Sequence, residues 1–147
     1  MVLMVLFVKN ELSYDTFHQK GPQLYRLTTT IPDKAGGKKT IGASGQVQGP
    51  AFKEAVPEIL DYTRFWDVGG FNIIGEGKSL IQQGLFADSS FFRMFTFPLL
   101  HGDPETALAD PFSIVITENT AIKYFGKTDV VGKILKVEEQ GFRPLTI

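Results

Sequence analysis

The stretch that decides the fold is residues 86–132, FADSSFFRMFTFPLLHGDPETALADPFSIVITENTAIKYFGKTDVVG. Its first part predicts one short helix. Asp88 is the expected N-cap, because its carboxylate can accept from the free N–H groups that open a helix at Ser89. Pro98 is expected to end this helix, since proline supplies no N–H and disfavours helix in the residue before it. The apolar face of the helix would be Phe91, Phe92 and Phe95.

The second part of the same stretch predicts a strand and then a capped helix. A turn at His101–Pro104 leads into a single helical turn over Glu105–Leu108. The β-branched run Ser113–Thr117 is short enough to be a buried strand. Thr117 can cap the next helix, and Gly126 is well placed as its left-handed stop. That helix would bury a face made of Ala121, Ile122, Tyr124 and Phe125, and the whole stretch would form an α/β packing unit.

Composition describes an ordinary globular protein. The chain has 147 residues, enough for one domain with a respectable core. A net charge of −1 favours neither nucleic acid nor an anionic membrane surface as a partner. The chain has no cysteine, which excludes disulfides, thiolate metal sites and cysteine nucleophiles. Thirteen phenylalanines against one tryptophan are best interpreted as core.

The rest of the chain alternates short helices with strands and glycine-rich turns. Before residue 58 we expect these elements in order: a short helix over Ser13–Gly21, a half-buried strand over Gln23–Ile31 with Tyr25 and Leu27 on its inner face, a loop at Asp33–Lys38, a weak strand near Thr40, and an amphipathic helix after Gly49-Pro50 that ends at Pro57.

The later part of the chain is predicted to be rich in strands. In order we expect a strand over Ile59–Val68 broken by Gly69-Gly70, a hairpin of Phe71–Ile74 and Leu80–Phe86 around the turn Gly75–Lys78, and two strands, Lys133–Val137 and Phe142–Ile147, around the turn Glu138–Gly141. The sequence therefore predicts an α+β fold of mixed sheets covered by short helices.

Three segments resemble one known family. The pattern ADSSFF..FTFPLL.GDP.TAL..P.SIVITE.TA.KYFG, over residues 87–126, resembles the extracytoplasmic domain of MacB/FtsX-type ABC transporter permeases, in the versions common in Bacteroidetes-like bacteria. Glu11–Leu27 resembles the segment after the first transmembrane helix of that family, and Pro57-Glu58-Ile59 with Arg64-Phe65 matches its middle. The three segments occur in the family's order and cover nearly the whole chain, although none is a catalytic motif.

The resemblance also suggests how the chain is organised. Met1–Val8 is uninterrupted apolar sequence, but a membrane span needs about 20 such residues. It can be a buried strand or the start of a helix; the resemblance favours the outer end of a transmembrane helix that is cut off at the chain's start. Residues 9–147 would then be a MacB-like periplasmic core domain with a porter-like fold, incomplete at its C-terminus.

The function that the resemblance implies is mechanical. A non-catalytic permease domain on the periplasmic side of the bacterial inner membrane would couple ATP-driven motion to substrate handling or export. Its implied partners are a cytoplasmic ATP-binding subunit, a second permease copy in a homodimer or pseudo-dimer, and a periplasmic adaptor. The alternative is a ligand-sensing ectodomain of a membrane signalling protein, with a groove lined by Tyr62, Phe65, Trp66 and Phe71.

No residue pattern indicates catalysis, a cofactor or a metal. Gly77-Lys78-Ser79 and Gly126-Lys127-Thr128 approach the phosphate-loop pattern, but Asn72 and Ala121 stand where its first glycine belongs. Both also fall in the wrong context, because a phosphate loop must open a helix.

The remaining polar residues favour structural roles as well. The two histidines, His18 and His101, lie far apart and outside any metal-binding pair. Ser89-Ser90 lacks the glycines of a nucleophile elbow. The acidic groups flank turns, so solvated loop charges are the favoured interpretation; they are Glu54, Glu58 and Asp61, and Asp103, Glu105 and Asp110. Basic residues are scattered without the aromatic stripe of a nucleic-acid surface. We predict no catalytic, cofactor-binding or metal-binding residue.

Overall fold

The computed structural model describes residues 13–34, 36–138 and 142–147, which form two compact units. Unit 1 contains the described residues up to Tyr62 together with Met94–Thr96. Unit 2 contains Thr63–Arg93 and Phe97–Ile147. The predicted membrane-helix end at Met1–Val8 lies outside the described residues.

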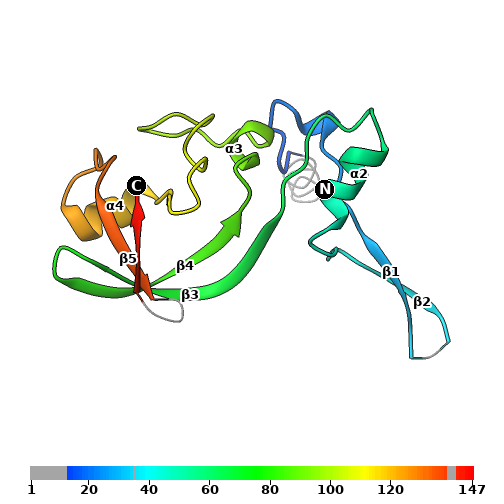
Figure 1. Ribbon diagram of the computed structural model, residues 1–147, viewed down its shortest axis with the longest axis horizontal. Coiled ribbons are helices and arrows are strands. Elements are labelled where there is room, and N and C mark those ends of the chain that lie inside the picture. The colour runs from blue at the N-terminus through cyan, green and yellow to red at the C-terminus, as the bar shows by residue number, and fades with distance from the viewer. Residues whose placement is uncertain (1–12, 35, 139–141) are drawn as a thin grey trace, which may run out of the picture. The chain divides into compact units, whose positions relative to one another are not determined.

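Unit 2 is built on a long hairpin within a four-stranded antiparallel sheet (Figure 1). Its turn is Glu76-Gly77, where both residues have positive φ (48° and 73°), as a two-residue type I′ hairpin turn requires. The strand order is β4-β3-β5-β6. Their bounds are β3 Phe65–Gly75, β4 Lys78–Ala87, β5 Ile134–Glu138 and β6 Phe142–Thr146. The predicted hairpin and the two predicted C-terminal strands are confirmed.

The prediction that Gly69-Gly70 would break a strand is wrong. β3 continues through both glycines, with a register shift between Asp67 and Gly69. Gly69 has a φ of 79°, and its N–H donates to the Asp67 carboxylate at 2.8 Å. Glycine in the left-handed region lets β3 carry one extra residue without ending the ladder, so Val68 and Gly69 form a β-bulge and Gly70 pairs regularly with Gln83. The predicted strand start at Ile59 is also wrong, because β3 begins at Phe65.

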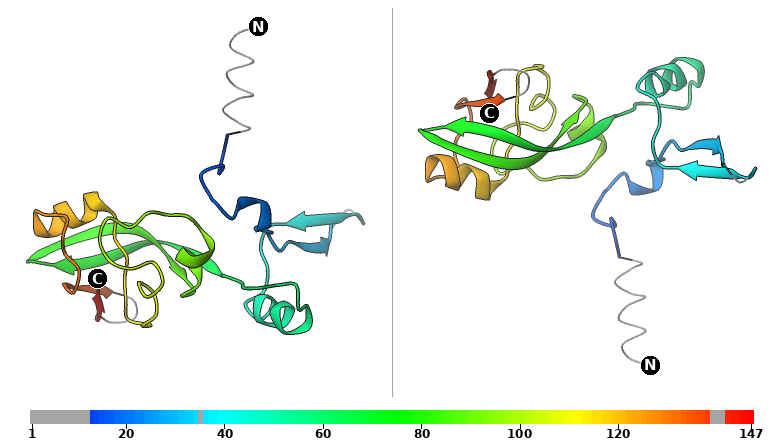
Figure 2. Two further views of the ribbon diagram at one scale, coloured as in Figure 1. Left: turned by 90° about the horizontal axis from the view of Figure 1, so that it is seen from above. Right: turned by 90° about the horizontal axis from the view of Figure 1, so that it is seen from below.

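Helix α4 (Glu118–Phe125) covers the hydrophobic core of unit 2, beside the turn end of the hairpin (Figure 2). Thr117 caps it as predicted, by accepting from the Thr120 N–H at 3.3 Å. Gly126 ends it at a φ of 71°, also as predicted. One face residue differs from the prediction, since Ile122 is 47% exposed. The buried core consists of Ile73, Tyr124, Leu135 and Val137.

The predicted strand Ser113–Thr117 does not form. Ser113 makes a single parallel bridge to Thr146 at the edge of β6, in which Ile114 N–H donates to the Thr146 carbonyl at 2.8 Å. The chain then leaves the sheet to start α4 at Glu118. Two of the β-branched residues, Ile114 and Ile116, pack against the hydrophobic core, although the segment does not form a strand ladder.

Unit 1 contains a two-stranded hairpin and a helix (Figure 1). The hairpin pairs β1 (Thr29–Pro32) with β2 (Lys38–Ile41) around the predicted loop. Helix α2 runs over Gln48–Ala55, close to its prediction, although it begins before Gly49-Pro50.

Two predictions for unit 1 are wrong. Ser13–Gly21 forms turns followed by a 3-10 helix, η1 (Gly21–Gln23), because Asp15 adopts a φ of 59° that an α-helix cannot contain. The strand expected from Gln23 is only β1, and Tyr25 is 88% exposed. The Arg26 guanidinium donates a hydrogen bond to the Gly42 carbonyl at 3.0 Å. Gly42 is the residue after the last β2 residue of the β1–β2 ladder, so a side chain bonds there in place of a further strand pair.

The helix expected after Asp88 is one turn, α3 (Phe91–Met94). It begins two residues later than Ser89 and ends well before Pro98. The expected helical turn at Glu105–Leu108 is a hydrogen-bonded turn anchored on the Asp103 carbonyl.

With two sheets and a few short helices, the predicted α+β class is confirmed. Among the described residues, none of the helices is both long enough and apolar enough to cross a bilayer.

Candidate functional site

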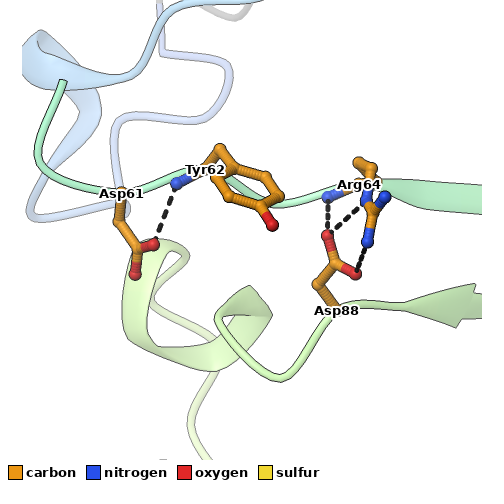
Figure 3. Close-up of polar contacts among 4 residues, drawn as sticks. All are labelled: Asp61, Tyr62, Arg64 and Asp88. Atoms are coloured by element: carbon orange, nitrogen blue, oxygen red, sulfur yellow. Dashed lines mark hydrogen bonds and ion pairs between the residues drawn. The ribbon is translucent and has the colours of Figure 1, made fainter. Parts of the chain in front are cut away.

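An arginine–aspartate clamp closes the open end of the β3–β4 hairpin in unit 2. Arg64 donates to the Asp88 carboxylate through its backbone N–H at 2.9 Å, Nε at 2.8 Å and Nη2 at 2.8 Å. The Asp88 N–H returns a bond to the Arg64 carbonyl at 3.0 Å, and the two side chains face each other in Figure 3. Two-point pairing of a guanidinium with a carboxylate is a strong, directional contact. It is suited to holding the two strand ends together.

The sequence contained a signal for this clamp that our prediction missed. The hairpin register pairs Phe65 with Ala87, so the next positions outward are Arg64 and Asp88. Opposite charges at facing positions of a hairpin attract each other. Asp88 was expected to cap a helix with its carboxylate, but that carboxylate accepts from Arg64, and it is the Asp88 backbone carbonyl that accepts from the Phe91 N–H.

A second brace joins α4 to the hairpin near its turn. The Tyr124 hydroxyl, in a residue that is 1% exposed, donates toward the Ile73 carbonyl at 2.9 Å and the Leu80 carbonyl at 3.3 Å. Burial raises the pKa of this hydroxyl, because it disfavours the charged phenolate. The Lys78 ammonium donates hydrogen bonds to the Lys123 carbonyl at 2.5 Å and to the Tyr124 carbonyl at 3.2 Å. A cation at the C-terminal end of a helix also meets the negative end of its dipole.

His18 has a structural role in unit 1, as the sequence suggested. It is 9% exposed, and its Nδ1 accepts from the Thr96 N–H at 3.0 Å. The Gln19 N–H donates to the Thr96 hydroxyl at 3.0 Å, and the His18 ring lies 5.2 Å from that of Phe95. These contacts hold Met94–Thr96 against the N-terminal part of unit 1. The other histidine, His101, is an exposed residue of unit 2.

The acidic residues singled out from the sequence serve loops and ion pairs. Asp61 accepts from Lys53 at 3.1 Å. It also accepts from the Tyr62 N–H at 3.0 Å, as Figure 3 shows. Asp103 accepts from the Glu105 N–H at 3.0 Å, and the Asp110 carboxylate accepts from the Phe112 N–H at 2.7 Å. Glu54, Glu58 and Glu105 are exposed. Within the described ranges, no three His, Asp or Glu side chains gather as a metal site would require.

The two near-phosphate loops lie where the sequence placed them. Gly77 is in the hairpin turn, and Gly126 ends α4, so neither opens a helix toward an anion. Ser89 and Ser90 form the turn before α3.

Two of the four aromatic residues proposed as a groove lie on opposite faces of one strand. Tyr62 belongs to unit 1, whereas the other three belong to unit 2. Phe65 and Trp66 are neighbours in β3, so their side chains point to opposite faces, and they are 58% and 61% exposed. The Phe71 ring packs edge-on against Phe86 at 5.6 Å. The described side chains of unit 2 form a hairpin that is braced at both ends and carries exposed apolar residues.

Comparison with known proteins places the chain in one family. The family model described as MacB-like periplasmic core domain matches residues 1–147. A crystal structure of a domain assigned to a permease protein of Porphyromonas gingivalis is similar, with a TM-score of 0.64 and 27% sequence identity. The likeness covers 82% of this chain and 52% of that one, so the chain spans about half the length of this relative. No curated protein matches the chain.

Proposed function

Because the chain belongs to the family of MacB-like periplasmic core domains, we propose that it couples ATP-driven motion to substrate handling outside the membrane. The match over all 147 residues is the observation that carries this proposal, and the likeness to a permease domain supports it. The chain would be the extracytoplasmic domain of an ABC transporter permease in the bacterial inner membrane. Its work would be mechanical, without catalysis by its own residues.

The construction of unit 2 suits such a role. A domain that transmits motion needs an element that moves without deforming, and a long hydrogen-bonded hairpin is one. Here the hairpin is held at one end by Arg64 and Asp88 and at the other by Tyr124 and Lys78. Displacement of one strand end would therefore be passed along the hairpin instead of separating its strands.

The partners follow from the same proposal. A cytoplasmic ATP-binding subunit would supply the energy, and two permease copies, or one copy and a homologous subunit, would form the pore. A periplasmic adaptor is a further proposed partner, and Met1–Val8 would be the outer end of a membrane helix. Nothing in the chain's charge favours nucleic acid.

A distance measurement would test the coupling. Residues 1–147 contain no cysteine, so once any cysteines elsewhere in the permease are replaced, a single spin label can be placed at an exposed residue of α4 such as Ile122. In the complete permease reconstituted with its ATP-binding subunit, coupling predicts that the label-to-label distance between copies changes when a non-hydrolysable ATP analogue binds. The same distribution with and without nucleotide, in a complex that still transports, would refute the proposal.

The sensing alternative is weaker. It depended on Tyr62, Phe65, Trp66 and Phe71 lining one groove, and Phe65 and Trp66 point to opposite faces of β3.

A further inference from the structure

Among the described residues, strand β4 is an edge strand of the unit 2 sheet and lacks the usual protection of an edge. It pairs with β3 on one side, and it is the first strand in the order β4-β3-β5-β6 among the described residues. Proteins usually protect such an edge with proline, with charges or with a very short strand. β4 has ten residues, KSLIQQGLFA, with no proline, no acid and one charge at its end. That charge, Lys78, is directed to the carbonyls at the end of α4.

The hairpin turn determines which backbone groups of β4 face outward. In a two-residue turn, the flanking pair Gly75 and Lys78 exchange hydrogen bonds, and bonded positions then alternate along the strand. Even-numbered residues of β4 therefore bond to β3. The Asp88 N–H, which donates to Arg64, continues this alternation at the other end. The outward N–H and C=O groups belong to Ser79, Ile81, Gln83, Leu85 and Ala87.

The side chains of β4 are arranged almost symmetrically about Gln83. Ile81 and Leu85 are on one face, with exposed fractions of 74% and 49%. Leu80 and Phe86 are on the other face, with 37% and 46%. Each pair is equally distant from Gln83 along the strand. An antiparallel copy of β4 would thus meet apolar with apolar on both faces.

We propose that β4 is a docking edge for a second copy of this chain, paired antiparallel with the twofold axis at Gln83. Ile81 then faces Leu85 of the other copy, Leu80 faces Phe86, and the two Gln83 residues face each other. Only outward-pointing residues form the bonded pairs, as an antiparallel ladder requires. The outward Ile81 carbonyl now accepts from the Gln82 side chain at 3.0 Å, an exposed contact that the partner's N–H replaces.

Neighbouring registers are less favourable. With the axis at Gln82, Ile81 would face Gln83 of the other copy and Leu80 would face Gly84. With the axis at Gly84, Phe86 would face Gln82. In each of these registers an apolar side chain faces a glutamine or a glycine, so the apolar cross-strand contact is lost. The twofold symmetry also makes the contact self-limiting, because the pairing uses up the edge of both copies. This surface does not depend on the transport role proposed above.

Cysteine cross-linking tests both the contact and its register. In Gln83→Cys, the two cysteines would occupy a bonded pair, whose Cα atoms lie about 5.5 Å apart, within the range for a disulfide. Ser79→Cys is the matched control, since Ser79 is exposed and on the same face of β4. In the proposed register its two copies would be eight residues apart along the strand, or about 27 Å. Under one oxidant, we expect the chain of residues 1–147 to cross-link through position 83 at least tenfold faster than through position 79.

A charge at the edge provides an independent measurement. Ile81→Lys adds a charge of the kind that guards natural edges, at a residue already 74% exposed. In sedimentation equilibrium, we expect the unsubstituted chain to dimerise and Ile81→Lys to raise the dimer dissociation constant about tenfold or more. Circular dichroism identifies any variant that fails to fold, in which case the remaining variant decides. A monomeric unsubstituted chain, equal cross-linking at both positions, or a dimer unaffected by Ile81→Lys would overturn the proposal.

Discussion

The brace between α4 and the hairpin is best tested by Tyr124→Phe, which removes a single oxygen atom from the core. The hydroxyl is the only part of Tyr124 that bonds to the carbonyls of Ile73 and Leu80, at 2.9 and 3.3 Å. Phenylalanine keeps the ring, so the packing against Leu135 and Val137 is preserved and no cavity opens.

The expected loss is about 1 kcal/mol of unfolding free energy, the net value of one buried hydrogen bond. A larger loss would follow if the substitution left a buried carbonyl without a donor. It does not, because Ile73 and Leu80 face each other in a bonded pair of the β3–β4 ladder. The melting temperature should fall by about 2–4 °C if the units unfold together, and by about 4–8 °C if unit 2 unfolds alone.

Urea unfolding followed by tryptophan fluorescence is a suitable assay, since the one tryptophan, Trp66, lies in β3. Repeating it at rising pH adds a second prediction. The pKa of Tyr124 is raised in the folded protein above its ordinary value of 10.0, chiefly by burial. The folded state therefore holds this proton more tightly than the unfolded state. The stability that it contributes is complete below pH 10 and is lost as the pH rises toward the folded pKa.

Tyr124→Phe lacks this titration, so its deficit relative to the natural chain should shrink above pH 10. Tyr25→Phe is the matched control, because Tyr25 is 88% exposed and should change stability by less than about 0.5 kcal/mol. A deficit of zero at neutral pH would show that the hydroxyl bonds do not hold α4 to the hairpin. A deficit that stays constant up to pH 11 would show that the pKa of Tyr124 is not raised in the folded protein.

Four other predictions concern single positions or the whole chain. Gly126→Val should cost about 1–3 kcal/mol because of backbone strain at a φ of 71°, and Gly126→Asn less; equal melting temperatures would contradict this. Asp88→Ala and Arg64→Ala should each cost about 1–2 kcal/mol and be non-additive in a double-mutant cycle. Gly75→Val should cost about 1–3 kcal/mol, because a Cβ there meets the Leu135 side chain; an unchanged urea midpoint would refute the close packing. The purified chain should not hydrolyse ATP, and phosphate release above a buffer blank would disprove that.

Much of unit 2 could be predicted from local sequence. The hairpin from Phe71 to Phe86 follows from alternating residues around a glycine turn. Helix α4 follows from its cap at Thr117 and its stop at Gly126. The family resemblance over residues 87–126 also agreed with the later comparisons. Each of these features depends on residues only a few positions apart.

The roles of the polar side chains could be predicted only in part from the sequence. No local pattern indicated chemistry, and of the carboxylates singled out from the sequence Asp61 forms an ion pair, while Asp103 and Asp110 accept from loop N–H groups. The clamp of Arg64 and Asp88 could have been found by extending the hairpin register outward by one residue. It was missed because Asp88 already had a sufficient local explanation as a helix cap.

Distant partners decided the rest. Helix α3 ends at Met94, and two residues later the Thr96 N–H bonds to His18, 78 positions away in sequence. Ser113–Thr117 has strand propensity, yet it makes a single bridge to Thr146 in β6. Its two isoleucines pack against the core instead. Short-range patterns set turns, caps and the hairpin because their hydrogen bonds close within the segment. Some backbone groups can form a hydrogen bond either with a neighbour in sequence or with a residue far along the chain. Which of these bonds forms depends on the segments that the fold brings together, and only the tertiary structure determines those segments.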